Sequence, residues 1–263
     1  MTKRALKRMA REGATETGHF ADDAKVRRLP VDHRERGNGW SPLGHEGPAK
    51  GPERDQSYLK TIKPKSPGQA ELMESIDNKN LVMALGPAGT GKTYIAIAKA
   101  VEALEAGSVA RIVLSRPAVE AGESIGYLPG DMEDKLAPYL RPLYDALTDR
   151  LSSRRMRALM ADGSIEIAPV GFMRGRTLNN AFVVIDEAQN CTYMQLKMLL
   201  TRLGWNSTMV VTGDPNQSDL LPGISGLADV AAKFDALENI GVVRLADRDI
   251  VRHPLVAEML GVL

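Results

Sequence analysis

From residue 81 onward, short and almost wholly apolar runs recur along the chain, separated by longer stretches in which apolar residues return every three or four positions. A continuous apolar run is typical of a strand buried on both faces of a parallel sheet, and the longer period is typical of a helix. Strands are therefore expected at 81–85, 111–115, 165–168, 181–185, 208–212 and 242–245, and helices at 67–76, 94–106, 132–151 and 152–160. This alternation predicts an α/β fold with a mostly parallel sheet flanked by helices, the third helix being interrupted or bent by Pro138 and Pro142.

The first 64 residues do not share this pattern. Residues 1–66 carry 15 Lys and Arg against 9 Asp and Glu, and residues 37–52 contain eight Gly and Pro. We expect residues 1–64 to form a basic, partly disordered extension and residues 65–263 to form the folded domain. The extension is either an arm that touches nucleic acid or a partner subunit, or a solvated tail.

The composition of the whole chain is that of an ordinary globular protein. It has 263 residues, of which 43% are hydrophobic and 25% charged, and a net charge of +1. Its one cysteine, Cys191, excludes an internal disulfide framework and fits a reducing compartment. The chain has neither an apolar run long enough to span a bilayer nor the apolar segment of a secretory signal, so a cytoplasmic protein is expected.

The first candidate site lies directly after the run at 81–85. Residues 86–93 read Gly-Pro-Ala-Gly-Thr-Gly-Lys-Thr and precede a predicted helix. Glycines in this context let successive backbone amides point at phosphate oxygens, with the lysine on the β- and γ-phosphates and the following hydroxyl on Mg²⁺. The expected nucleotide-binding residues are Gly86, Pro87, Ala88, Gly89, Thr90, Gly91, Lys92 and Thr93, with Thr93 also a metal ligand.

Gln69 has two interpretations. Its amide carries a donor and an acceptor side by side, which matches the N6 and N7 edge of adenine and would select ATP. Alternatively, Ser66 and Gln69 form a helix capping box with Pro67 at the first helical position. A position just before the first strand of a nucleotide-binding core favours the adenine role.

A second candidate site follows the apolar run at 181–185, which ends in two adjacent carboxylates, Asp186 and Glu187. Hydrolysis of a nucleoside triphosphate needs one carboxylate to hold the Mg²⁺ water shell and a base to polarise the attacking water. We assign these roles to Asp186 and Glu187 respectively. A strand cap followed by an acidic helix start is the alternative.

Further polar residues follow other predicted strands. Gln217 stands where it could sense the γ-phosphate, and Arg252 is a candidate transition-state arginine, with Arg248 a weaker competitor. Arg116, Arg174 and Arg176 are candidates for nucleic-acid or subunit contacts, because the carboxyl ends of parallel strands line ligand crevices. For the last two, ion pairing with acidic residues of 120–134 is an equal alternative.

These motifs together resemble the PhoH family of ATPases over roughly residues 65–263. The resemblance is carried by segments 86–93, 116–123, 128–131, 138–145, 173–179, 186–190 and 251–254. It implies a RecA-like P-loop NTPase fold similar to the core of superfamily-one helicases, with ATP and Mg²⁺ as cofactors. It also implies Gln69 on adenine, Gln217 as sensor, Arg252 as arginine finger, and a ring-shaped homo-oligomer, expected to be a hexamer. Residues 1–64 do not resemble the nuclease-like domain of some relatives, so ribonuclease activity is not expected.

Two functions are compatible with this resemblance. The first is a Mg²⁺-dependent ATPase that couples hydrolysis to RNA or single-stranded DNA, as helicases do. The second is an assembly protein that binds and slowly hydrolyses ATP to lock oligomers, with no nucleic-acid track. Aromatic residues make up only 5% of the chain, and no aromatic-rich basic groove decides between them.

Overall fold

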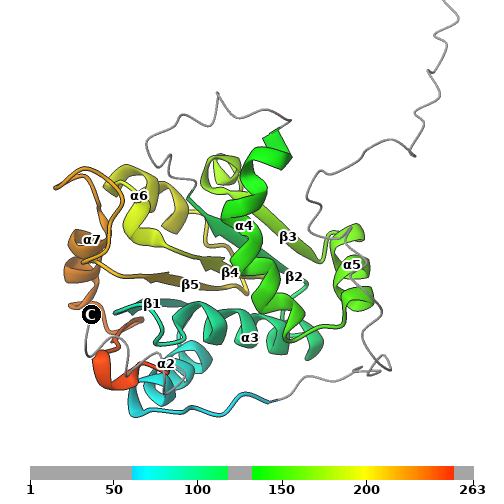
Figure 1. Cartoon of the computed structure of the whole chain (residues 1–263), viewed down its shortest axis with the longest axis horizontal. Helices are drawn as coiled ribbons and strands as arrows, with labels where there is room; N and C mark the ends of the chain where they lie inside the picture. Colours follow the sequence, from blue (N-terminus) through cyan, green and yellow to red (C-terminus); the bar gives the residue numbers. More distant parts are fainter. Residues whose placement is uncertain (1–60, 118–131, 252–263) are drawn as a thin grey trace, which may run out of the picture. The chain divides into compact units, whose positions relative to one another are not determined.

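The computed structural model describes residues 61–117 and 132–251, and their elements are labelled in Figure 1. The predicted basic extension lies almost wholly outside the described residues, as do Arg252 and most of the segment that follows Arg116.

A parallel sheet of six strands forms the centre of the described chain. Its order is β3-β2-β4-β5-β1-β6, and every neighbouring pair is parallel. Each predicted apolar run is a strand, which confirms the α/β fold with a parallel sheet. The strands are β1 (Leu81–Leu85), β2 (Arg111–Arg116), β3 (Ile165–Pro169), β4 (Ala181–Ile185), β5 (Thr208–Gly213) and β6 (Ile240–Arg244).

Helices cover both faces of the sheet, which explains why its inner strands β1 and β4 are apolar and buried throughout (Figure 1). Along β1, Val82 and Ala84 belong to one core and Leu81, Met83 and Leu85 to the other. The first core is closed by α2 (Pro67–Asn78), α3 (Lys92–Glu105), α4 (Met132–Thr148) and α5 (Ser153–Ala161). The second is closed by η2 (Val170–Met173), α6 (Tyr193–Leu200) and α7 (Leu227–Phe234).

The four helices expected from the sequence correspond to α2, α3, α4 and α5, which all pack in the first core. The expected interruption of the third helix is absent, since α4 runs through Pro138 and Pro142 as one element. The sequence pattern predicts neither α6 nor α7. The start of α6 is nevertheless marked in the sequence, because Thr192 and Gln195 form a capping box there.

Strand order decides where the candidate residues meet. The carboxyl ends of parallel strands lie at one edge of the sheet, so the segments after β1, β2, β4 and β5 converge there. The strand before the glycine-rich loop, β1, does not pair with β4, because β5 lies between them. The end of β5 is therefore placed between the loop and the two carboxylates.

Candidate active site

The glycine-rich loop leaves β1 and enters α3 through three glycines with positive φ angles. These are Gly86 at 140°, Gly89 at 85° and Gly91 at 83°. A β-carbon at Gly86 would collide with the carbonyl oxygen of Leu245, which follows β6. The sequence therefore needs glycine here both for conformation and for space. The resulting turn leads directly into the first residue of α3, as expected of a phosphate-binding loop.

Lys92 is folded back onto the loop that precedes it. Its Nζ donates to the carbonyl oxygens of Gly86 at 2.6 Å and Pro87 at 2.8 Å. Burial lowers the pKa of Lys92 below its ordinary value, although the charge of Asp214, and then those of Glu187 and Asp186, acts in the opposite direction. The ammonium group thus lies inside the candidate phosphate site with acidic groups around it.

Asp186 is the most constrained acid of the site, being only 2% exposed. Its Oδ1 accepts hydrogen bonds from the Thr93 hydroxyl at 2.5 Å and from the Thr212 hydroxyl at 2.7 Å. The structure thus brings together the two residues that the sequence assigned to a metal, although 93 positions separate them along the chain. Among the described residues no three Asp, Glu, His or Cys side chains gather as a metal cage. One hydroxyl and one carboxylate still fit Mg²⁺, which in nucleotide sites takes few protein ligands and completes its shell with phosphate and water.

Glu187 lies beside Asp186 in an unusual backbone conformation. Its φ of 51° and ψ of 44° are left-handed, which is uncommon for a residue with a side chain. Its Oε2 accepts a hydrogen bond from Gln189 Nε2, whose Oε1 in turn accepts from the backbone N–H of Asp214 at 3.1 Å. Gln189 therefore links the candidate base to the loop that follows β5.

Arg116 contacts both carboxylates from the end of β2. Its NH1 lies 3.4 Å from Asp186 Oδ2 and its NH2 lies 3.6 Å from Glu187 Oε1. The sequence suggests an outward role for this arginine, in nucleic-acid or subunit contact. In the structure its guanidinium faces the candidate metal site instead.

Gln69 connects α2 to the phosphate-binding loop. Its Nε2 donates to the Thr90 carbonyl at 3.0 Å, and its Oε1 accepts from the backbone N–H of Lys65 at 2.8 Å. Half of the alternative capping box is also present, because the Ser66 hydroxyl accepts from the Gln69 N–H at 3.2 Å. Gln69 lines a cavity of about 480 Å³ together with Met73, Gly91, Tyr94 and other residues. This cavity adjoins the glycine-rich loop, since Gly89 also lines it.

A second cavity, of about 320 Å³, contains most of the candidate catalytic residues. Lys92, Thr93, Asp186, Glu187 and Gln217 line it. The Gln217 side chain is exposed, and its backbone N–H donates to the Asp214 carbonyl. The sequence reasoning missed Thr212, Gln189 and Asp214, which line the same cavity. All three are polar residues at or just after strand ends, and that position is the signal by which they could have been found.

The remaining arginine candidates differ in their surroundings. Arg176 forms a two-pronged ion pair with Glu166 at 2.5 and 2.6 Å, so it is engaged within the domain. The side chains of the acids of 120–134, its predicted alternative partners, lie outside the part of the chain that the structure describes. Arg174 is exposed just after η2. Arg252 lies outside the described residues, and Arg248 is exposed in η4 (Asp247–Asp249).

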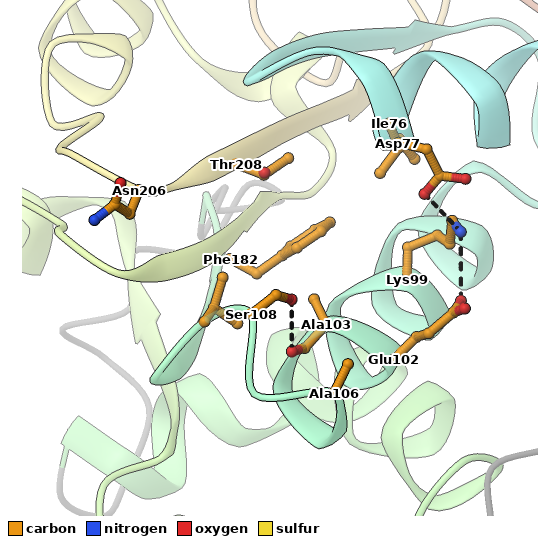
Figure 2. Close-up of a pocket in the computed structure, with 11 residues that line it drawn as sticks. Ile76, Asp77, Lys99, Glu102, Ala103, Ala106, Ser108, Phe182, Asn206 and Thr208 are labelled. Carbon is orange, nitrogen blue, oxygen red and sulfur yellow. Dashed lines mark hydrogen bonds and ion pairs between the residues drawn. The ribbon is translucent and has the colours of Figure 1, made fainter.

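Another hollow lies at the opposite, amino-terminal edge of the sheet and is drawn in Figure 2. Its volume is about 410 Å³, and Phe182, Thr208 and the second half of α3 line it. Lys99 is its cation, but that ammonium is already paired with Asp77 at 2.7 Å and Glu102 at 3.4 Å. The hollow has no glycine-rich loop, so the chemistry expected from the sequence belongs to the other edge.

The part of the chain that contains these elements matches a known protein family. The model of the family described as PhoH-like protein matches residues 61–263. The chain belongs to this family. The match spans every element of the candidate site, from Gln69 to the segment after β6.

Curated relatives agree with this membership. The chain is 52% identical over 202 residues to the PhoH-like protein of Bacillus subtilis (strain 168), covering 76% of this chain and 63% of the relative. It is 46% identical over 210 residues to Protein PhoH of Escherichia coli (strain K12), covering 79% of this chain and 59% of the relative. The PhoH-like chain therefore spans about three fifths of the length of these curated relatives.

Solved structures similar to the PhoH-like chain are remote in sequence. The large terminase of a thermophilic bacteriophage, in complex with ADP, is 14% identical, with a TM-score of 0.45, over 75% of this chain and 49% of that chain. Bacteroides sp Pif1 in complex with ADP-AlF4 is 17% identical, with a TM-score of 0.33, over 76% of this chain and 46% of that chain. Within the described part of the PhoH-like chain, no helix is long and apolar enough to cross a membrane.

Proposed function

We propose that this chain is a Mg²⁺-dependent ATPase that couples hydrolysis to RNA or single-stranded DNA. The observation that carries the ATPase step is the meeting of Thr93, Asp186 and Glu187 in one cavity with Lys92. A phosphate-binding loop needs a metal aspartate and a base beside it before water can attack the γ-phosphate. Two segments at one edge of the sheet supply them here, the loop after β1 and the adjacent carboxylates after β4.

The site residues have distinct tasks in this proposal. Backbone amides of the loop bind the α- and β-phosphates, and Lys92 turns from the carbonyls of Gly86 and Pro87 to the β- and γ-phosphates. When bound, Mg²⁺ neutralises charge on those phosphates, with Thr93 and Asp186 holding it. Glu187 accepts the proton of the attacking water, and Gln189 keeps its carboxylate oriented.

The choice of nucleotide depends on the cavity beside Gln69. The amide of Gln69 has one hydrogen bond on each atom, which leaves one N–H and one oxygen lone pair for the edge of an adenine. Tyr94 and Met73, which line the same cavity, offer apolar surface to the base. We therefore propose ATP as the nucleotide.

Coupling to nucleic acid is supported by family resemblance and by Arg174. Arg174 is exposed, whereas Arg116 and Arg176 face carboxylates within the domain. An exposed arginine at the strand edge that carries the nucleotide site is suitably placed for a phosphate of a single strand. A core of this size has one motor domain, so movement along a strand would need a homo-oligomer, which we propose to be a ring of six.

A second function, a nucleotide-switched assembly protein without a nucleic-acid track, is favoured by a different observation. Large apolar side chains are exposed on the described surface, including Trp205 at 85%, Leu221 at 73% and Met194 at 68%. Exposed apolar groups of this size contribute to contacts between proteins where they form one continuous patch.

The experiment that tests these proposals is steady-state ATP hydrolysis with and without single-stranded RNA or DNA, across a salt series. Glu187→Gln should lower the rate about 10²-fold or more and serves as the blank. Stimulation that weakens as salt rises, and that Arg174→Gln reduces, would support coupling to a phosphate backbone. A rate that depends on Glu187 but ignores nucleic acid would favour the assembly protein, and a rate equal in wild type and Glu187→Gln would refute the ATPase.

A further inference from the structure

Each oxygen of the two site carboxylates faces a polar or charged group of the chain itself. Asp186 Oδ1 takes the hydroxyls of Thr93 and Thr212, and its Oδ2 faces the guanidinium of Arg116. Glu187 Oε2 takes the amide of Gln189, and its Oε1 also faces Arg116. Arg116 is therefore a cation that pairs with both acids, and the charge of Lys92 also acts on them.

The position of Arg116 in the sheet favours this contact. Arg116 ends β2, which pairs directly with β4, with Ser115 opposite Ile185. The backbone N–H of Asp186 donates to the Ser115 carbonyl at 2.8 Å, which fixes the relation of the two strand ends. Because Pro117 follows, the backbone of Arg116 is restricted to extended conformations, and its side chain alone has to move to break the contact.

The proposed chemistry needs the same two carboxylates, although Thr93 lies at Oδ1 of Asp186 and Arg116 at Oδ2. A guanidinium cannot lose its charge at any ordinary pH, so it cannot share these carboxylates with a divalent cation without repulsion. Pairing of Arg116 with the carboxylates and binding of a metal to them therefore oppose each other.

We propose that Arg116 is a stand-in cation, which pairs with Asp186 and Glu187 when no nucleotide is bound and leaves them when Mg²⁺ and ATP bind. The proposal rests on the proposed ATP and Mg²⁺ site and adds a competitor within it. Arg116 protects two adjacent carboxylates from mutual repulsion in the empty site. It also sets the Mg²⁺ concentration at which nucleotide binds, and its guanidinium becomes available to other groups only in the nucleotide-bound state.

The test is the binding of a fluorescent, non-hydrolysable ATP analogue measured at rising Mg²⁺ concentration. Arg116→Gln removes the competitor, so half-maximal binding should need about twofold to fivefold less Mg²⁺, the effect of losing one partly exposed ion pair. Arg116→Lys keeps the charge but not the two-pronged contact and should lie between wild type and Arg116→Gln. Arg155→Gln is the matched control, because it breaks an ion pair between Arg155 on α5 and Glu105 on α3, away from the site. It should leave the Mg²⁺ concentration for half-maximal binding unchanged.

A second measurement follows unfolding instead of binding. In a chelator, Arg116→Gln should unfold at a lower temperature than wild type, because its two carboxylates have lost their cation, and Mg²⁺ with the analogue should narrow this difference. Arg155→Gln should show no such narrowing.

The outcomes separate the two proposals. If wild type binds the analogue in a Mg²⁺-dependent way but Arg116→Gln needs the same or more Mg²⁺, the stand-in role is wrong and Arg116 instead contacts the bound nucleotide or metal shell. If wild type binds no analogue, or binds it equally well in chelator, the proposed site itself is wrong, and the stand-in role falls with it.

Discussion

Asp249 joins the end of the sheet to the start of α2, and its removal gives a sharp test of the structure. The residue is 1% exposed. Its Oδ1 accepts from the backbone N–H of Gly68 at 3.1 Å and its Oδ2 from that of Ala246 at 2.9 Å. Asp249→Ala leaves both donors without an acceptor, at a cost of about 2–4 kcal/mol in the free energy of unfolding. For a domain of this size that corresponds to a fall of about 4–16 °C in Tm.

The pH dependence gives this prediction a second, independent part. Hydrogen bonds from the Ala246 N–H, then from the Ser66 hydroxyl and the Gly68 N–H, hold the pKa of Asp249 below its ordinary 3.8. The stabilisation is therefore fully present above about pH 4 and is lost as pH falls through the lowered pKa. Asp249→Asn lacks this titration, so the difference in Tm between it and wild type should shrink below pH 3.8.

Thermal unfolding followed by circular dichroism measures both effects. Asp235→Ala is the control, because it removes an exposed aspartate paired with Arg244 and should leave Tm within about 2 °C. Gly68→Ala tests the same contact from the other side, since its β-carbon would lie 2.5 Å from Asp249 Oδ2. If Asp249→Ala and Asp235→Ala unfold at the same temperature, the buried contact between η4 and α2 is wrong.

Three further predictions concern the site and its surroundings. Burial lowers the pKa of Lys92, whereas bound phosphate favours its charged form, so nucleotide affinity should fall as pH rises from 7 toward about 10. Arginine stays charged over this range, so the affinity of Lys92→Arg should not show this dependence on pH. Thr212→Val removes a hydroxyl that holds Asp186 and should weaken Mg²⁺-dependent nucleotide binding about twofold to tenfold; an unchanged Mg²⁺ titration would argue against this bond. Burial raises the pKa of the Cys191 thiol to about 12, so iodoacetamide should label the native protein negligibly. Mass spectrometry should find one label per chain after unfolding in urea. Rapid labelling of the native protein would contradict the burial of Cys191.

The sequence predicts local features of this molecule well and non-local ones poorly. Residues 86–93 and the pair Asp186 and Glu187 could be identified because each follows an unbroken apolar run, and the strand and its terminal residues are contiguous. The contacts of Thr212 depend on β5 lying between β1 and β4, which no contiguous pattern reveals.

Arginines illustrate the same limit. Arg116, Arg174 and Arg176 look alike in the sequence, each near the end of a predicted strand. The pairing of β2 with β4 places Arg116 beside the site carboxylates, whereas Arg176 meets Glu166 of β3. The sequence shows that each residue is a charged arginine, but the order of the strands in the sheet determines which carboxylate it pairs with.

Strand order also has a consequence for how the domain is made. The strand before the phosphate-binding loop has both its neighbours far downstream, with Leu81 opposite Met209 on β5 and Ile240 on β6. During synthesis the loop therefore emerges long before the strands that hold it, and parallel pairings over such separations form slowly. Until β5 and β6 arrive, β1 is an apolar strand with two open edges, which is a template for aggregation. Nucleotide at the proposed site can stabilise the fold only after the chain has been made as far as β6, so it cannot protect earlier fragments.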